Sequence, residues 1–175
     1  MSRRGLLVAG LIGLLSGLVG VPATAAQPAY VLKDGVTQPV FSFADAIRET
    51  VWVDIGLDLD GNGVGDRVAT DIIRPATSSQ VPVIIDASPY YQSTGRGNES
   101  EIKTYDSAGK PVKFPLFYDN YFVPRGYAVA LVDFSGSNRS TGCMDTGGQS
   151  EIASGKAVID WLNGRATGYT AASGG

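Results

Sequence analysis

The chain has 175 residues, with 14 basic and 17 acidic side chains, a formal net charge of −3 and no histidine. This length is enough for one modest domain with a hydrophobic core. The acidic balance and the absence of a basic stripe argue against nucleic-acid binding, which needs clustered Lys and Arg.

The first 26 residues have the three parts of a secretory signal peptide. Arg3 and Arg4 form a positive start, an apolar run covers residues 6–21, and small residues precede a cleavage site after Ala25 or Ala26. The run is too short, and too often interrupted by glycine, for a membrane span. The arginine pair also resembles a twin-arginine export signal, so the export route stays open. The sequence predicts a secreted, extracellular protein that is not held in a membrane after cleavage.

A lead-in segment is expected over residues 27–50, followed by a β-hairpin. From Thr50 to Leu59 apolar and polar residues alternate, which predicts a half-buried strand. A segment rich in glycine and aspartate follows, and "VATDIIRP" then resumes a strand that ends at Pro75.

Two short apolar runs predict buried strands, and a helical pattern follows the second. The run Val83–Ile85 has the continuous β-branched character of a strand covered on both faces, and "GYAVALVDF" gives the second strand. Between them, "FPLFYDNYFVPRGY" predicts a short helix ahead of Pro124. This order of elements predicts an α/β sheet with crossover connections.

The segment "SEIASGKAVIDWLNGR" predicts an amphipathic helix that ends near Gly164. Its expected buried side carries Ile152, Val158, Ile159 and Leu162.

The glycine-rich link of the hairpin partly matches the start of a calcium-binding loop. The match consists of Asp58, Asp60, Asn62, Gly63 and Asp66. The glutamate required at the twelfth position is replaced by alanine, and the flanking elements are strands rather than helices. A tight turn accounts for the same residues. We therefore assign no metal, while a secreted calcium-dependent binding module remains an alternative function.

Ser140 is the first candidate for a hydrolase nucleophile, because Gly142 follows it as in the G-x-S-x-G elbow. Asn138 stands where the leading glycine is needed, and the serine lies seven residues beyond Asp133, in a loop. The chain also has no histidine to accept its proton. These features predict that Ser140 is a loop serine.

Two further features stand out. Cys143 is the single cysteine, so in an oxidising compartment we expect it to pair with a cysteine beyond Gly175. The cluster Ser88-Pro89-Tyr90-Tyr91 directly follows the first predicted buried strand. From the residues alone, its tyrosines are best explained as packing residues with a polar tip.

Three motifs together resemble the X-prolyl dipeptidyl-peptidase family of serine hydrolases, which includes the cocaine-esterase-like acyl hydrolases. They are "SPYY", "DNYFVPRGYAVALVDFSGSNRSTGC" and "AVIDWLNGRATGY", in the family's order and approximate spacing. The resemblance implies that residues 51–175 are the N-terminal part of an α/β-hydrolase domain, truncated before the strand that leads to the nucleophile. It places Ser140 in the family's G-x-x-x-S-x-G loop, and Ser173 is no substitute nucleophile because Ala171 precedes it.

The resemblance also implies one catalytic residue within the chain. In the family, a tyrosine in the x-P-Y loop after the first buried strand donates its hydroxyl to the oxyanion, and Tyr90 occupies that position. The nucleophile, the acid and the histidine would be absent, so the chain alone is expected to be inactive. The expected function of the complete protein is a dipeptidyl-peptidase acting on X-Pro peptide substrates without a cofactor. The alternative within the same fold is an ester or amide acyl hydrolase.

Overall fold

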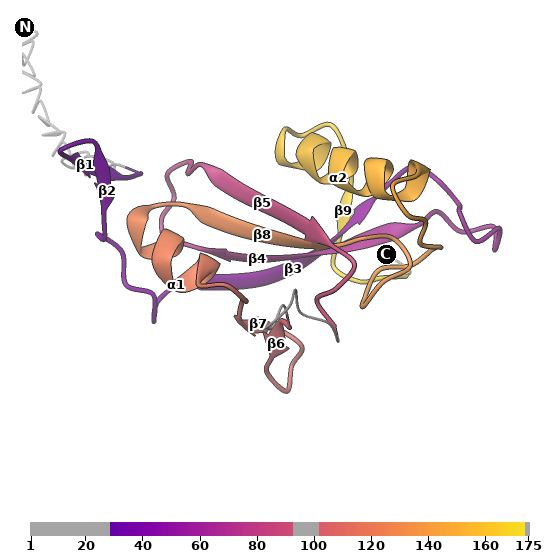
Figure 1. Cartoon of the computed structure of the whole chain (residues 1–175), viewed down its shortest axis with the longest axis horizontal. Helices are drawn as coiled ribbons and strands as arrows, with labels where there is room; N and C mark the ends of the chain where they lie inside the picture. The colour runs from indigo at the N-terminus through magenta and orange to yellow at the C-terminus, as the bar shows by residue number, and fades with distance from the viewer. Residues whose placement is uncertain (1–28, 93–101, 174–175) are drawn as a thin grey trace, which may run out of the picture.

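The computed structural model describes residues 29–92 and 102–173 of the chain (Figure 1). The expected signal peptide, residues 1–26, lies outside the described residues. Within the described part, no helix combines the length and apolar character that a membrane span requires.

The centre of the molecule is a five-stranded mixed sheet with the strand order β5-β8-β4-β3-β9. Its strands are β3 (Ile47–Asp54), β4 (Arg67–Arg74), β5 (Val83–Ser88), β8 (Ala128–Asp133) and β9 (Gly168–Tyr169). β3 pairs antiparallel with β4, β4 pairs antiparallel with β8, and β5 pairs parallel with β8. The parallel pair is joined by a long crossover, as the sequence predicts for an α/β sheet.

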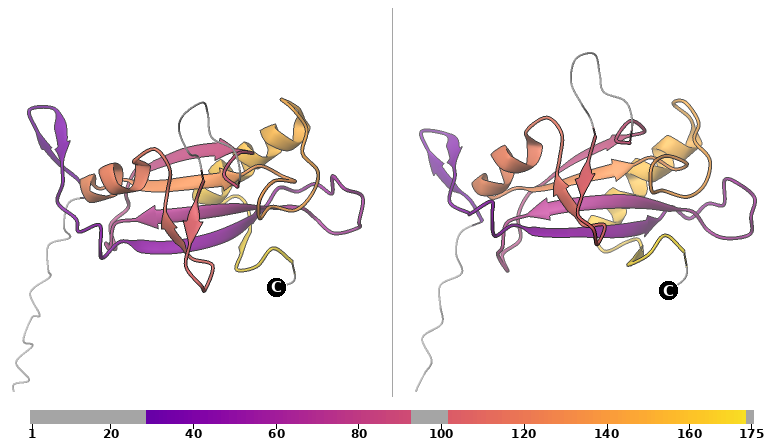
Figure 2. Two further views of the ribbon diagram at one scale, coloured as in Figure 1. Left: turned by 60° about the horizontal axis from the view of Figure 1, so that its bottom comes forward. Right: turned by 90° about the horizontal axis from the view of Figure 1, so that it is seen from below.

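The remaining elements lie outside this sheet. Strands β1 (Val31–Lys33) and β2 (Val36–Gln38) form a separate hairpin in the lead-in segment. The crossover from β5 to β8 contains β6 (Thr104–Tyr105), β7 (Pro111–Lys113), α1 (Tyr118–Phe122) and the 3-10 turn η1 (Val123–Arg125). Helix α2 (Gln149–Leu162) follows β8. Figure 2 shows the β6–β7 hairpin beside the β3–β4 hairpin, and β7 contacts both strands.

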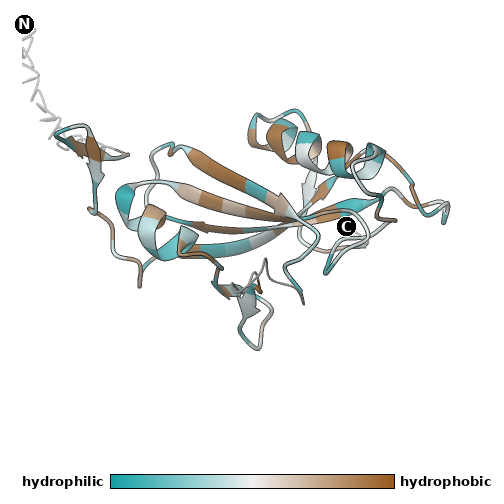
Figure 3. Cartoon of the chain, in the orientation of Figure 1, coloured by the Kyte–Doolittle hydropathy of each residue, from teal (hydrophilic) through white to brown (hydrophobic). Residues whose placement is uncertain are grey.

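The core is divided between the two faces of the sheet, because successive residues of a strand point to opposite faces. Val132 and Val53 pack with Val158 of α2 on one face. Leu131 and Val129 pack on the other face, with residues of the crossover such as Phe114 and Val123. Figure 3 shows the apolar residues gathered along β4, β5 and β8, between these two covering layers.

The predicted hairpin is confirmed, but its first strand is displaced along the chain. β3 begins at Ile47 and ends at Asp54, so the alternating residues Ile55, Leu57 and Leu59 lie beyond it. They still contact the core under α2, since the chain folds back through hydrogen bonds from Ile55 N to Asp66 O (3.0 Å) and from Asp66 N to Leu57 O (2.7 Å). The alternating pattern therefore predicts correctly that these apolar residues face the core. It predicts incorrectly that the strand continues to Leu59.

The two predicted buried strands differ in the structure. β8 is buried along its whole length, as expected. β5 is not, because it lies at the edge of the sheet, and Val83 is 37% exposed. A continuous β-branched run therefore identified a strand of the parallel pair, but the prediction that β5 is covered on both faces is wrong for the described chain.

Helix α2 lies where the sequence predicts it, but it buries a different face. Ile152 and Ile159 are 69% and 50% exposed, and Leu162 is also exposed. Of the residues expected in the core, only Val158 is fully buried. The other buried positions of α2 are Ser150, Ser154 and Ala157.

The reason for this difference is that the buried face of α2 is made of small residues. Ser154 Oγ donates to Ser150 O at 2.6 Å and accepts from Ser135 N at 3.2 Å, so its hydroxyl is satisfied inside the protein. Small, hydrogen-bonded serines let the helix approach the end of β8 more closely than isoleucine would. A hydrophobicity pattern alone places these serines on the solvent side.

Candidate active site

The candidate site lies at the carboxyl ends of β5 and β8. These parallel strands end in register, with Ser88 opposite Asp133, so the two following loops emerge at the same edge of the sheet. Loops at this edge are the usual place for binding and catalytic groups in open α/β sheets. The loop after β5 contains Tyr90, and the loop after β8 contains Ser140.

The two tyrosines of the first loop have different environments. The Tyr90 side chain is 46% exposed, and its backbone N–H donates to Ser88 Oγ at 3.2 Å. Tyr91 is 2% exposed and packs with Phe114 and Leu131 in the core. The packing interpretation thus holds for Tyr91, whereas the position of Tyr90 leaves its ring open to another molecule.

Ser140 lies in the loop after β8, as predicted, and its hydroxyl is engaged by the backbone of two strands. Ser140 Oγ donates to Asp133 O at 2.7 Å and accepts from Ala69 N at 2.8 Å. It therefore joins the end of β8 to β4. A hydroxyl held in this way is a structural link, and no histidine exists in the chain to activate it.

The glycines of the same loop permit its tight fold. Gly136 and Gly142 both have positive φ, and a Cβ on Gly136 would lie 2.4 Å from the backbone N of Met144. Gly136 N donates to Thr141 O at 2.9 Å, and Thr141 N donates to Arg67 O at 3.0 Å. The G-x-x-x-S-x-G pattern thus encodes a compact loop that fastens β8 to the start of β4.

Beneath the loops lies a buried ion cluster that the sequence analysis missed. Lys103 Nζ contacts Asp71 Oδ2 at 2.7 Å and Asp133 Oδ1 at 2.6 Å, and all three side chains are inaccessible to solvent. Arg139 Nη2 contacts Asp71 Oδ1 at 2.9 Å. The two carboxylates and two cations balance one another, as buried charges require.

Neutral donors complete the cluster around the same two carboxylates. Asp71 accepts hydrogen bonds from Thr50 Oγ1 at 2.6 Å and from Tyr105 Oη at 2.7 Å. Asn138 Nδ2 donates to Asp133 Oδ2 at 2.9 Å. One sequence signal points to this arrangement, since Asp71 interrupts the apolar strand "VATDIIRP" and a charged residue inside a buried strand needs a partner.

Burial changes the proton affinity of two members of the cluster. It raises the pKa of the Asp133 carboxyl, and the neighbouring Lys103 ammonium opposes that rise. Burial and the adjacent Asp71 carboxylate also raise the pKa of the Tyr105 hydroxyl. The Tyr105 hydroxyl therefore remains protonated and acts as a donor to Asp71.

The calcium-like loop uses its carboxylates as turn acceptors. Asp58 accepts from the backbone N of Asn62 (3.1 Å) and Gly63 (2.9 Å), and Asp60 accepts from Asn62 N (3.1 Å). Asp66 is buried and accepts from Leu59 N at 2.7 Å. Across residues 29–92 and 102–173, no group of three or more His, Cys, Asp or Glu residues is arranged to hold a metal ion.

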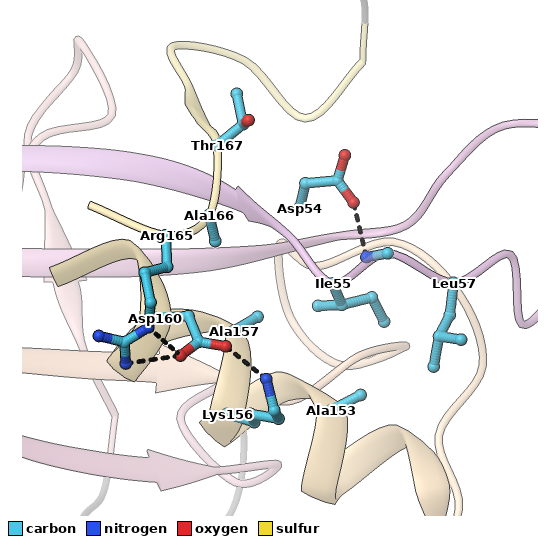
Figure 4. A pocket seen from close by; sticks show the side chains of 11 residues that line it. Asp54, Ile55, Leu57, Ala153, Lys156, Ala157, Asp160, Arg165, Ala166 and Thr167 are labelled. Carbon is cyan, nitrogen blue, oxygen red and sulfur yellow. Dashed lines mark hydrogen bonds and ion pairs between the residues drawn. The ribbon is translucent and has the colours of Figure 1, made fainter. Parts of the chain in front are cut away.

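A hollow of about 390 Å³ lies between α2 and the end of β3, and Figure 4 shows its lining. Asp160 lies between Lys156 and Arg165, with Arg165 Nη2 at 2.8 Å, and the Lys156 ammonium makes the second ion pair. The hollow includes no residue of the Tyr90 or Ser140 loop. It is therefore separate from the candidate site.

Cys143 is exposed, and no disulfide involves it in the described chain.

Comparison with known proteins gives consistent matches. The model of the X-Pro dipeptidyl-peptidase family, S15, matches residues 60–174. A putative Xaa-Pro dipeptidyl-peptidase of Streptomyces avermitilis is 62% identical over 140 residues, which cover 78% of this chain and 21% of that protein. A protein of the same description from Bacillus anthracis is 41% identical over 146 residues, covering 79% of this chain and 24% of the relative.

Among solved structures, a CocE/NonD family hydrolase from Staphylococcus aureus is similar, with a TM-score of 0.43 and 20% sequence identity. The match covers 66% of this chain and 20% of that one. The chain thus spans between about a fifth and just over a quarter of the length of the curated relatives that it matches.

Proposed function

Because the chain belongs to the X-Pro dipeptidyl-peptidase (S15) family, we propose that it contributes the first strands of the α/β-hydrolase domain of a longer, secreted serine peptidase. That peptidase removes dipeptides from peptides with proline in the second position. The observation that carries this proposal is the exposed Tyr90 at the carboxyl edge of the parallel strand pair, in a chain with this family match.

In this proposal, the nucleophilic serine, the histidine and the acid come from other parts of the polypeptide. The serine attacks the carbonyl carbon of the proline residue and forms an acyl-enzyme, and the histidine transfers the serine proton to the leaving amine. Negative charge develops on the carbonyl oxygen, and the Tyr90 hydroxyl donates a hydrogen bond to it. In this fold, one oxyanion donor comes from the loop at the position that Tyr90 occupies.

The roles of the two loops differ. The loop after β5 supplies a donor group, and the loop after β8 supplies rigidity through Ser140 and its glycines. Two findings favour this division: the Tyr90 ring is exposed, and the Ser140 hydroxyl already has both a donor and an acceptor partner.

Export from the cell is the second part of the proposal, and it rests on the pattern of residues 1–26. N-terminal sequencing of secreted protein tests it, with a first residue of Ala26 or Gln27 expected. A protein that keeps Met1 and sediments with membranes would contradict it.

The activity is tested with a polypeptide of the relatives' length that begins with this chain. We expect it to release the dipeptide from Xaa-Pro anilides much faster than from Xaa-Gly anilides, and mass spectrometry identifies the product. N-acetylated substrates serve as the control, since a dipeptidyl-peptidase requires a free amino terminus. Hydrolysis of simple aryl esters without cleavage of X-Pro substrates would instead identify an acyl hydrolase of the same family.

A further inference from the structure

We propose that Lys103 is a positioning residue for Tyr90, which acts by fixing the adjacent Tyr91 to the ends of β4 and β8. The proposal rests on the function proposed above. It gives a role to the buried ion cluster.

The first step of the argument is that Lys103 is held firmly. Its ammonium lies 2.7 Å from Asp71 Oδ2 on β4 and 2.6 Å from Asp133 Oδ1 on β8. Because the pairs are shielded from water, they are stronger and more rigid than exposed pairs. The crossover segment that contains Lys103 is thereby attached to two neighbouring strands.

The second step is that Lys103 holds Tyr91 in two ways. Its backbone N–H donates to Tyr91 O at 3.2 Å, and its ammonium lies 4.8 Å from the centre of the Tyr91 ring. The Tyr91 ring in turn packs against Phe114 and Leu131. Tyr91 is therefore fixed at its main chain and at its side chain.

The third step concerns Tyr90, which is one residue away. The loop is fixed on one side by the bond from Tyr90 N to Ser88 Oγ and on the other by Tyr91. Tyr90 is 46% exposed and lies outside the buried cluster that holds Tyr91, so its direction depends strongly on these two anchors. A donor group must be held close to its productive position, and an error of about 1 Å can cost about 10²-fold in rate.

The cluster itself offers no net charge to a ligand. Asp71 and Asp133 are matched by Lys103 and Arg139, and Thr50, Tyr105 and Asn138 provide further donors. The geometry therefore favours a positioning role over a binding role.

The test is a double-mutant cycle in the polypeptide of the relatives' length. Lys103→Met is combined with Asp133→Asn, which removes one buried positive and one buried negative charge together. This pair of substitutions is made with Tyr90 intact and with Tyr90→Phe. Lys156→Met with Asp160→Asn likewise removes one positive and one negative charge, here from the ion-paired residues of α2, and serves as the control.

We expect the Lys103 and Asp133 substitutions to lower kcat by about 10²-fold when Tyr90 is intact, with KM little changed. In the Tyr90→Phe background the same substitutions should lower kcat by less than about threefold, because the positioned donor is already absent. The control pair should leave kcat unchanged in both backgrounds. Equal losses of kcat with and without the Tyr90 hydroxyl would mean that the cluster only stabilises the fold, and would overturn the proposal.

Hydrogen exchange provides a readout that does not depend on activity. In the Lys103 and Asp133 variant, the peptide covering residues 88–92 should exchange roughly tenfold faster, while the peptide covering α2 is unchanged. Unchanged exchange at residues 88–92 overturns the proposal whatever the kinetics. Faster exchange there, together with a Tyr90→Phe enzyme of full activity, would instead reject the catalytic role of Tyr90 and with it the positioning role.

If the double substitution fails to fold, Lys103→Arg replaces it. This variant keeps the charge, but a larger planar head replaces the compact ammonium that contacts Asp71, Asp133 and the Tyr91 ring. A loss of kcat that disappears in the Tyr90→Phe background is again expected, and a loss that persists there overturns the proposal.

Discussion

Tyr90 and Tyr91 are neighbours in the chain, yet one is 46% exposed and the other is 2% exposed. The exposed ring follows Pro89, the first residue after β5, and the buried ring is fixed by Lys103 and the core. Of the two rings, the Tyr90 ring is therefore the one that is accessible to another molecule.

Replacement of Tyr90 by phenylalanine tests its role as an oxyanion donor, since it removes the hydroxyl and keeps the ring. In the polypeptide of the relatives' length, we expect kcat to fall about 10²–10³-fold with little change in KM, because the hydrogen bond strengthens only as charge develops. Steady-state kinetics on an X-Pro anilide measure this. Tyr91→Phe is the matched control and should lower kcat far less. A larger loss for Tyr91→Phe would show that the donor has been assigned to the wrong tyrosine.

Ser140→Ala should affect stability rather than chemistry. The substitution leaves Ala69 N and Asp133 O without the hydroxyl that joins them, so we expect a loss of about 1–3 kcal/mol in the free energy of unfolding. Denaturant unfolding measures this loss, and an exposed serine such as Ser173 provides the control substitution. In the polypeptide of the relatives' length, the folded Ser140→Ala variant should still react with an active-site serine reagent. If the folded variant no longer reacted with the serine reagent, Ser140 would have to be the nucleophile, which would contradict the structural role given to it here.

Gly136→Ala should destabilise the protein more than Gly147→Ala does. Both glycines have positive φ, so each substitution carries the same cost of placing alanine in the left-handed region, about 1–2 kcal/mol. A Cβ at Gly136 would also meet the Met144 backbone, whereas nothing lies within 4 Å of the corresponding position at Gly147. We expect this clash to add about 1–3 kcal/mol, measured as the difference in unfolding free energy. Equal losses of unfolding free energy in the two variants would mean that the loop around Gly136 can shift to accommodate the Cβ.

The start of α2 should respond to acid through Asp145. Hydrogen bonds from the Ser150 side chain (2.5 Å) and backbone N (3.1 Å) lower the pKa of the Asp145 carboxyl. A carboxyl whose pKa is lowered by folding stabilises the protein above its unfolded pKa, near 3.9, and this stabilisation is lost as the pH falls through the folded pKa. The melting temperature of Asp145→Ala should therefore lie below that of the parent at pH 6, and the gap should narrow below about pH 4. A gap that does not change with pH would contradict this assignment.

The 175-residue chain expressed alone should hydrolyse neither X-Pro anilides nor simple esters above background. It contains no histidine, and loss of the histidine or serine of such a catalytic unit lowers the rate by about 10⁶-fold. Labelling with a serine-reactive fluorophosphonate should also be absent. Specific labelling of any serine in the chain would contradict the role proposed for it.

The features that were predictable from the sequence are those encoded by neighbouring residues. The alternating pattern around Val53 identified the hairpin, and the run that contains Leu131 identified β8. The buried face of α2 was not predictable, because Ser150 and Ser154 are buried for their small size and their hydrogen bonds rather than for hydrophobicity.

The ion cluster escaped prediction for a different reason. Asp71, Lys103 and Asp133 are about thirty residues apart, and no local pattern shows that they meet. The charged Asp71 inside a buried strand indicates that a partner exists. Which residue is that partner depends on how the crossover packs against the sheet. The contrast between Tyr90 and Tyr91 has the same origin, since the burial of Tyr91 depends on Lys103 and Phe114.

The same separation in sequence has a consequence for how this part of the molecule folds. The two carboxylates that pair with Lys103 lie on β4 and β8, so these buried charges balance only when β4, β8 and the crossover come together. An intermediate with one of these segments missing would bury an unbalanced charge at high cost. We therefore expect the crossover and the two strands to assemble in a single cooperative step, with no populated species in which the sheet is formed and Lys103 is still in water.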